Sequence, residues 1–287
     1  MLARQIASMA KRHLHKLYWP LPLLLHSMEA NAWGLVTHLY FAHSLLWAMP
    51  LLDPRLQRAI KRFPELVMAG ACLPDLAIVS PAFRETHDWE YAKRMLNAAK
   101  TDEETAIAVG YASHLYVDVI AHNHFVPAHE AMWLDNDTMM THIASEWAMD
   151  AHLSPLLDTS PGHLLTEHRE LLVVFISPLF RCSRHRTTQA VRSLAFWDKV
   201  LRMVRLPHII YRSARLLDKR VGKNFIYYIA KTQTALAEIS IVLDGARPTW
   251  EPESQLSGEA LAQWRRVCKR QVTALHPAPI RYFDQIL

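Results

Sequence analysis

Two histidine–carboxylate pairs, each spaced four residues apart, constrain the fold of this chain more than any other feature. His114 and Asp118 form the first pair, and His142 and Glu146 form the second. Both segments have the composition of helices, and residues four apart share one face of a helix. Each pair therefore presents an imidazole and a carboxylate in the same direction. This is the ligand chemistry that zinc prefers in catalytic sites with open positions, so we expect metal between helices.

The composition of the 287 residues predicts an all-α protein. Glycine is scarce, at 7 residues, and the hydrophobic fraction of 51% is sufficient for a sizeable core. The sequence contains no convincing strand pair and no hairpin turn signal. Thr101 and Glu104 have the spacing of a capping box, which predicts the start of a helix that runs toward His122. We expect a loop at residues 76–85 and a polar linker at 158–168.

The charge favours anionic partners. The net charge is +5 with neutral histidines, which suits phospholipid headgroups, phosphodiesters or nucleic acid, or serves solubility alone. No stretch approaches the roughly 18 consecutive apolar residues of a spanning helix. The segment 202–223 is basic and amphipathic, with Ile209, Ile210 and Leu216 among Arg and Lys. It has the pattern of a helix that lies on a membrane surface, or of an ordinary surface helix.

Residues 1–32 have the pattern of an export leader. A basic start precedes a short apolar run at 17–25, and Ala30-Asn31-Ala32 stands directly before Trp33 as a small-x-small cleavage pattern. Cleavage after Ala32 would place the protein in the periplasm or outside the cell. An uncleaved leader, or a start at Met28, would leave it in the cytoplasm.

Further candidate ligands lie before and between the two pairs. Two histidines follow Asp118: His122 shares its helical face, and His124 lies where the helix could end and turn back. Asp150, four residues past Glu146, is placed to orient a ligand imidazole. Upstream candidates of the same chemistry are Trp33, His38, Asp75 and His87.

The order of these residues resembles the zinc-dependent phospholipase C family, which shares its fold and trinuclear zinc site with fungal zinc-dependent single-strand nucleases. The resemblance covers about residues 33–157, and residues 158–287 have no obvious counterpart, so we expect them to form a helical part packed on this core. In the family an N-terminal Trp donates its amine and carbonyl to one zinc. The metal ligands that the resemblance implies are Trp33, His38, Asp75, His87, His114, Asp118, His124, His142 and Glu146. Its His-x3-Asp-x5-His spacing prefers His124, while the absence of Gln-Pro before that residue keeps His122 open.

The resemblance implies hydrolysis of a phosphodiester, most directly in a phospholipid, by a water that zinc activates. Asp118 would bridge two metals, and Asp88 or Asp150 would orient the water. We expect two zinc ions if the leader blocks the Trp33 amine and three if it is free. One alternative is a nuclease or nucleotidase whose bases stack on Trp89 and Tyr111. The other is a non-catalytic, membrane-peripheral protein with a structural zinc site.

Overall fold

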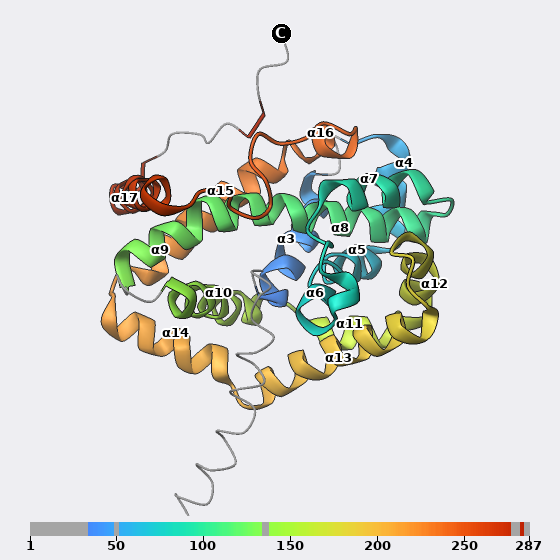
Figure 1. Ribbon diagram of the computed structural model, residues 1–287, viewed down its shortest axis with the longest axis horizontal. Coiled ribbons are helices and arrows are strands. Elements are labelled where there is room, and N and C mark those ends of the chain that lie inside the picture. Colours follow the sequence, from blue (N-terminus) through green and yellow to red (C-terminus); the bar gives the residue numbers. More distant parts are fainter. Residues whose placement is uncertain (1–33, 49–51, 134–137, 277–281, 284–287) are drawn as a thin grey trace, which may run out of the picture. The chain divides into compact units, whose positions relative to one another are not determined.

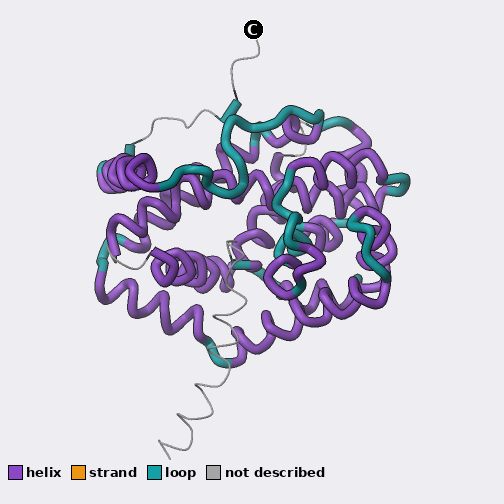
Figure 2. Tube along the Cα trace, viewed as in Figure 1, coloured by secondary structure: helices purple, strands orange, loops and turns teal. Residues whose placement is uncertain are grey.

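The described part of the chain is built from helices (Figures 1 and 2). The computed structural model describes residues 34–48, 52–133, 138–276 and 282–283. No strand occurs within these ranges, so the predicted all-α class is confirmed. Residues 1–32 and Trp33 lie outside the described residues.

The helices of the described residues follow one another closely along the chain. The α-helices are α3 (Leu35–Ala48), α4 (Pro54–Arg62), α5 (Pro64–Gly70), α6 (Leu76–Val79), α7 (Trp89–Ala98), α8 (Asp102–Ile120), α9 (Val126–Trp133), α10 (Thr138–Leu153), α11 (Pro161–Glu167), α12 (Arg169–Leu179), α13 (Arg184–Met203), α14 (Leu206–Leu217), α15 (Val221–Leu236), α16 (Ile239–Leu243) and α17 (Gly258–Thr273). Two 3-10 turns are η2 (Pro81–Phe83) and η4 (Ser154–Leu156), and η3 (Ala121–Phe125) is a π-helical segment.

Local capping residues explain where these helices begin. The Thr101 side chain accepts from the Glu104 amide, and the Glu104 carboxylate accepts from the Thr101 amide, so the predicted capping box is present. The predicted polar linker at 158–168 is wrong, because Ser160 caps α11 and Pro161 occupies its first turn. The predicted loop at 76–85 is wrong in part, since the short helices α6 and η2 interrupt it.

Helix α8 is the central element of the core. Every residue from Thr105 to Ile120 is buried, and α3, α4, α5 and α7 all pack against this helix (Figure 1). The crossing with α5 is very close: a Cβ at Gly110 would lie 1.9 Å from the Val67 carbonyl oxygen. Glycine is required at this position because any side chain would push the two backbones apart. The crossing brings the end of α5 beside His114, one turn after Gly110.

The later helices pack around this core. Helix α10 contacts α3, α9 and α14, while α17 packs on α9 and α11 packs on α5 and α13. The chain divides into the units Met1–Asn31 and Ala32–Leu287, and all described residues belong to the second. The division into parts at residue 158 stays a prediction. None of the described helices has the length and apolar character needed to span a membrane.

Candidate metal centre

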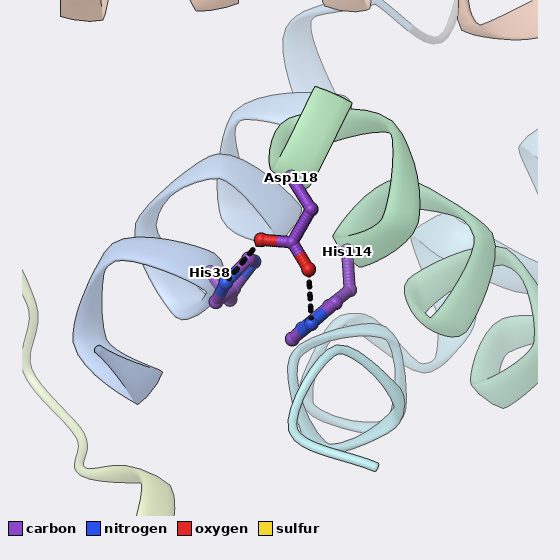
Figure 3. Close-up of side chains that lie close together, drawn as sticks. All are labelled: His38, His114 and Asp118. Atoms are coloured by element: carbon purple, nitrogen blue, oxygen red, sulfur yellow. Dashed lines mark ion pairs between the residues drawn. The ribbon is translucent and has the colours of Figure 1, made fainter. Parts of the chain in front are cut away.

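Asp118 lies between two imidazoles in the buried interior (Figure 3). Its Oδ2 is 2.9 Å from Nε2 of His114 on the same helix, and its Oδ1 is 3.3 Å from Nε2 of His38 on α3. The rings of His38 and His114 stack with their centroids 3.5 Å apart. These three residues form a first group of ligand-type atoms, all within 4.8 Å of one another.

A second group shares His114 with the first. It adds Asp75, which directly precedes α6, and His87, which lies before α7. His87 Nε2 is 3.3 Å from His114 Nε2 and 3.4 Å from Asp118 Oδ2, while Asp75 Oδ1 lies 3.9 Å from both imidazole nitrogens. The structure thus brings His87 to the oxygen of Asp118 that faces His114, and it brings Asp75 beside both imidazoles.

A third group joins His122, His142 and Glu146. Glu146 Oε1 lies 2.9 Å from His142 Nε2 and 3.4 Å from His122 Nε2. The side chain of His142 is 14% exposed, more than those of His122 and Glu146 at 3% and 4%. This group therefore has its access to solvent on the His142 side.

The structure brings His122, and not His124, beside the carboxylate of Glu146. The chain passes from α8 into the π-helical segment η3, whose wider turn changes which side chains face the carboxylates. His122 points toward Glu146, whereas the His124 ring lies among three aromatic rings and outside all three groups. These rings belong to Trp250, Trp264 and Tyr282. The four-residue spacing of Asp118 and His122, which puts both on one helical face, was the feature of the sequence that indicated the position of His122.

Backbone carbonyls fix the orientation of two of the imidazoles. His114 Nδ1 donates to the Ala71 carbonyl at 2.7 Å, which the close α5–α8 crossing makes accessible. His122 Nδ1 donates to the Pro252 carbonyl, also at 2.7 Å. Because each ring places its proton on Nδ1, its Nε2 lone pair faces the carboxylates. Such partners are the usual support for histidine ligands of metals.

The centre buries three carboxylates, on Asp75, Asp118 and Glu146. Burial raises the pKa of Asp75 well above its usual value, and burial raises that of Glu146 to about 8 although His122 opposes the shift. For Asp118, burial acts in the same direction, but the imidazoles of His114 and His38 outweigh it and hold the pKa well below its usual value.

The donor set fits a metal ion. Both carboxylate oxygens of Asp75 are buried and find no hydrogen-bond partner among the described residues. Burial lowers the pKa of His87 to about 3 and that of His142 to about 4, so both rings are neutral at pH 7 and able to bind a cation. A buried carboxylate stays ionised only beside positive charge, which a metal ion would supply, and imidazole with carboxylate suits zinc.

Asp88 and Asp150 lie outside these groups and have other partners. Asp88 is exposed and caps α7 by accepting from the Glu90 amide at 2.9 Å. Asp150 accepts from the Val36 amide at 3.3 Å, the Thr37 amide at 2.8 Å and the Thr37 hydroxyl at 2.7 Å. Asp150 therefore holds the first turn of α3, the helix that carries His38. We expected it to orient a ligand imidazole, and that prediction is wrong.

The aromatic residues considered for base stacking are core residues. Trp89 is 7% exposed and Tyr111 is fully buried, with its hydroxyl bonded to the Thr86 carbonyl oxygen. A fourth group of ligand-type residues, Glu65, Glu167 and His168, lies near the surface away from the buried centre.

The fold and the three buried groups together define a class: an all-α protein with a candidate metal centre of histidines and carboxylates between its helices. The model of the zinc dependent phospholipase C family matches residues 37–177. This match contains every candidate ligand from His38 to Glu146, and it places residues 37–177 in that family, which is named for zinc dependence and for a hydrolase of the phospholipase C type. No curated protein and no solved structure matches the chain.

Proposed function

We propose that this protein is a zinc-dependent phosphodiester hydrolase that acts on phospholipids in the manner of a phospholipase C. The observation that carries the proposal is that three buried groups of ligand-type side chains lie inside the segment that matches the family. Two of these groups share His114, and the third contains Glu146. A purely structural site would need only one closed set of four ligands.

We assign the ligands by group. Asp75, His87 and His114 would hold one zinc ion, and His122, His142 and Glu146 would hold a second. Asp118 extends its two oxygens toward different imidazoles, which suits a carboxylate that bridges ions. The group of His38 and Asp118 would take a third ion if the Trp33 amine completes it.

The protein's own residues prepare the centre for hydrolysis. Bound zinc lowers the pKa of water toward 7 and polarises phosphoryl oxygens. The carbonyls of Ala71 and Pro252 hold the His114 and His122 rings in place. Burial of Asp75 and Asp118 keeps bulk water away from their carboxylate oxygens, and the low dielectric there would strengthen each interaction with a bound metal.

Apolar side chains near the open side of the centre favour lipid over nucleic acid. Met139 and Met140, at the start of α10, are 46% and 47% exposed and lie within one turn of His142. Exposed thioethers at this position suit an acyl chain or the glycerol backbone of a lipid. Trp89 and Tyr111 offer no stacking surface, because both are buried.

The test is zinc content measured together with hydrolysis of a panel of phospholipids and single-stranded nucleic acid. We expect zinc in the purified protein and lipid hydrolysis that a chelator abolishes. His114→Ala and Glu146→Ala should each remove the activity, whereas His185→Ala, an exposed histidine on α13, should not. Full zinc occupancy without turnover of any phosphodiester would favour the structural zinc site, and a preference for nucleic acid would favour the nuclease.

We further propose that the leader is removed after Ala32 during export, which frees the Trp33 amine. The small-x-small pattern before Trp33 supports this, and an α-amine with a pKa near ~7.7–8.0 readily gives up its proton to zinc. Sequencing the N-terminus of protein from its native host is the test. A mature chain that begins at Met1 or Met28 would reject the proposal and indicate a cytoplasmic protein.

A further inference from the structure

The outer face of α13 alternates cationic and apolar side chains. Arg192, Phe196, Lys199 and Met203 are spaced by four, three and four residues, so they share one face of the helix. All four are exposed, and the two apolar side chains are 58% and 74% exposed. The opposite face of α13 buries Ala190, Leu194 and other residues in the core, so the helix does not need Phe196 or Met203 for packing.

Helix α14 repeats the same pattern. Ile209, Arg212 and Leu216 on the helix, with Arg205 directly before it, have the same spacing and are all exposed, with Ile209 at 56% and Leu216 at 84%. Its other face packs on α10, where the Tyr211 hydroxyl bonds to His152 Nδ1 at 2.8 Å. We call these eight residues, which lie on α13, on α14 and, for Arg205, between the two helices, the α13–α14 stripe. The two helices follow each other directly and meet at the lower edge of the view in Figure 1.

The positive charge of this stripe is not compensated by nearby carboxylates. Residues 199–223 contain eight Lys or Arg and one acidic residue, Asp218. Within the described chain, none of the four stripe cations forms an ion pair, and the carboxylate of Asp198 is already engaged by Arg202 and by the Gly162 amide. The stripe therefore presents four unneutralised cations to its surroundings.

A hollow beside α13 extends this cationic surface. It has a volume of about 500 Å³, and its lining includes Arg169 from α12 with Arg192, Phe196 and Lys199 of the stripe. The three cations can face an anion in this hollow, while the phenyl ring of Phe196 forms an apolar edge.

We propose that the α13–α14 stripe is a docking surface for a bilayer that contains anionic lipid. Lys and Arg would contact the headgroups, and Phe196, Met203, Ile209 and Leu216 would enter the boundary with the acyl chains, as in helices that lie in the membrane interface. A nucleic acid would contact the cations but would leave the apolar side chains in water. A second copy would oppose like charges. This surface lies outside the matched family segment, and it extends the proposed function without depending on the metal centre.

Cosedimentation of the zinc-loaded protein with vesicles tests the proposal. One set of vesicles is pure phosphatidylcholine and the other contains 30% phosphatidylglycerol, each at about 0.1 M salt. Arg205→Gln with Arg212→Gln should lower the partition coefficient for anionic vesicles about 30-fold, since each cation contributes about fivefold. Ile209→Ser with Leu216→Ser, which keeps the charge, should lower it roughly 10-fold or more.

Matched controls come from exposed residues elsewhere. Arg266→Gln with Arg270→Gln on α17 removes the same charge, and Val174→Ser with Ile226→Ser removes exposed apolar side chains from α12 and α15. Both controls should bind vesicles like the wild type. Hydrogen exchange of the wild type should show protection of residues 196–216 when anionic vesicles are added, a readout that needs no variant.

The outcomes separate this proposal from its rivals and from the hydrolase. Diffuse electrostatic attraction would replace this proposal if the Arg205/Arg212 and Arg266/Arg270 variants lost vesicle binding equally. In that case the Ile209→Ser, Leu216→Ser variant would bind vesicles like the wild type. Absence of vesicle binding with concentration-dependent dimerisation would overturn the proposal in favour of a second copy. Hydrolysis of a water-soluble phosphodiester, measured in parallel, should be unchanged in all stripe variants. A variant that loses only this activity has a defect in the metal centre, and a variant that loses only vesicle binding has a defect in the stripe.

Discussion

Removing the Asp150 carboxylate should destabilise the fold by about 3 kcal/mol. In Asp150→Ala, the Val36 amide and the Thr37 hydroxyl lose their acceptor, and the Thr37 amide keeps only the Gly34 carbonyl at 3.0 Å. A buried group left without a partner costs about 1–3 kcal/mol and a lost bond to a charged acceptor costs about 1.5–3 kcal/mol, so the three losses together cost about 6 kcal/mol. Burial raises the pKa of Asp150 from 3.8 to about 6, and relief of that buried charge offsets about 3 kcal/mol.

Thermal and denaturant unfolding of the zinc-loaded protein at pH 7 measure this change. A net loss of about 3 kcal/mol corresponds to a fall in Tm of about 6–12 °C for a chain of this size. Asp150→Asn should cost less, because its amide oxygen still accepts from Thr37. Asp88→Ala is the matched control: it also removes a helix-capping aspartate, but an exposed one with a single bond, and should cost about 1 kcal/mol.

Equal destabilisation by Asp150→Ala and Asp88→Ala would refute the reasoning, because burial of the three bonds is what distinguishes the two sites. Hydrolysis gives a second comparison. Asp88→Ala should retain it, whereas Asp150→Ala should weaken zinc binding through the loosened first turn of α3 and the displaced His38. Loss of hydrolysis in a fully folded Asp88→Ala protein would restore Asp88 to the role of orienting the water.

Three further predictions follow from the geometry of the centre. His122→Ala should remove about one zinc per chain by elemental analysis and abolish hydrolysis, while His124→Ala should leave zinc content unchanged; the reverse would favour the family spacing over the structure. Zinc binding to the metal-free protein at pH 7 should release protons, because burial raises the pKa of Glu146 to about 8 and a ligand carboxyl must ionise. Titration calorimetry in buffers of different ionisation enthalpy should show less release at pH 9, and release that does not change with pH would contradict this assignment. Gly110→Ala places a Cβ 1.9 Å from the Val67 carbonyl oxygen and should cost at least about 1–3 kcal/mol in denaturant unfolding. It should also weaken zinc binding about 10–100-fold by moving Ala71 away from His114; normal stability and zinc affinity would show that the crossing is loose.

Local patterns in the sequence predicted the helices well and the details of the centre less well. The capping box at Thr101 and the His114/Asp118 pair depend only on neighbours along one helix, and the structure contains both. The choice between His122 and His124 depended on a π-helical turn at residues 121–125. No residue type in this segment predicts that the helix widens there. Asp150 could be placed on the same helical face as Glu146, but its partners on α3 lie more than a hundred residues earlier.

The burial of α8 on all sides has a consequence for how this protein can change. The helix that supplies His114 and Asp118 is also the centre of the hydrophobic core, so the same sixteen-residue stretch must satisfy packing and the proposed metal binding together. A substitution there alters folding and chemistry at once. We therefore expect substrate preference to vary through substitutions at exposed positions such as Met139 and Met140. Such substitutions would disturb neither the packing of α8 nor the candidate metal centre. The metal-free chain, with carboxylates in its middle, should fold less stably than the loaded one, which would make the amount of folded protein respond to the supply of zinc.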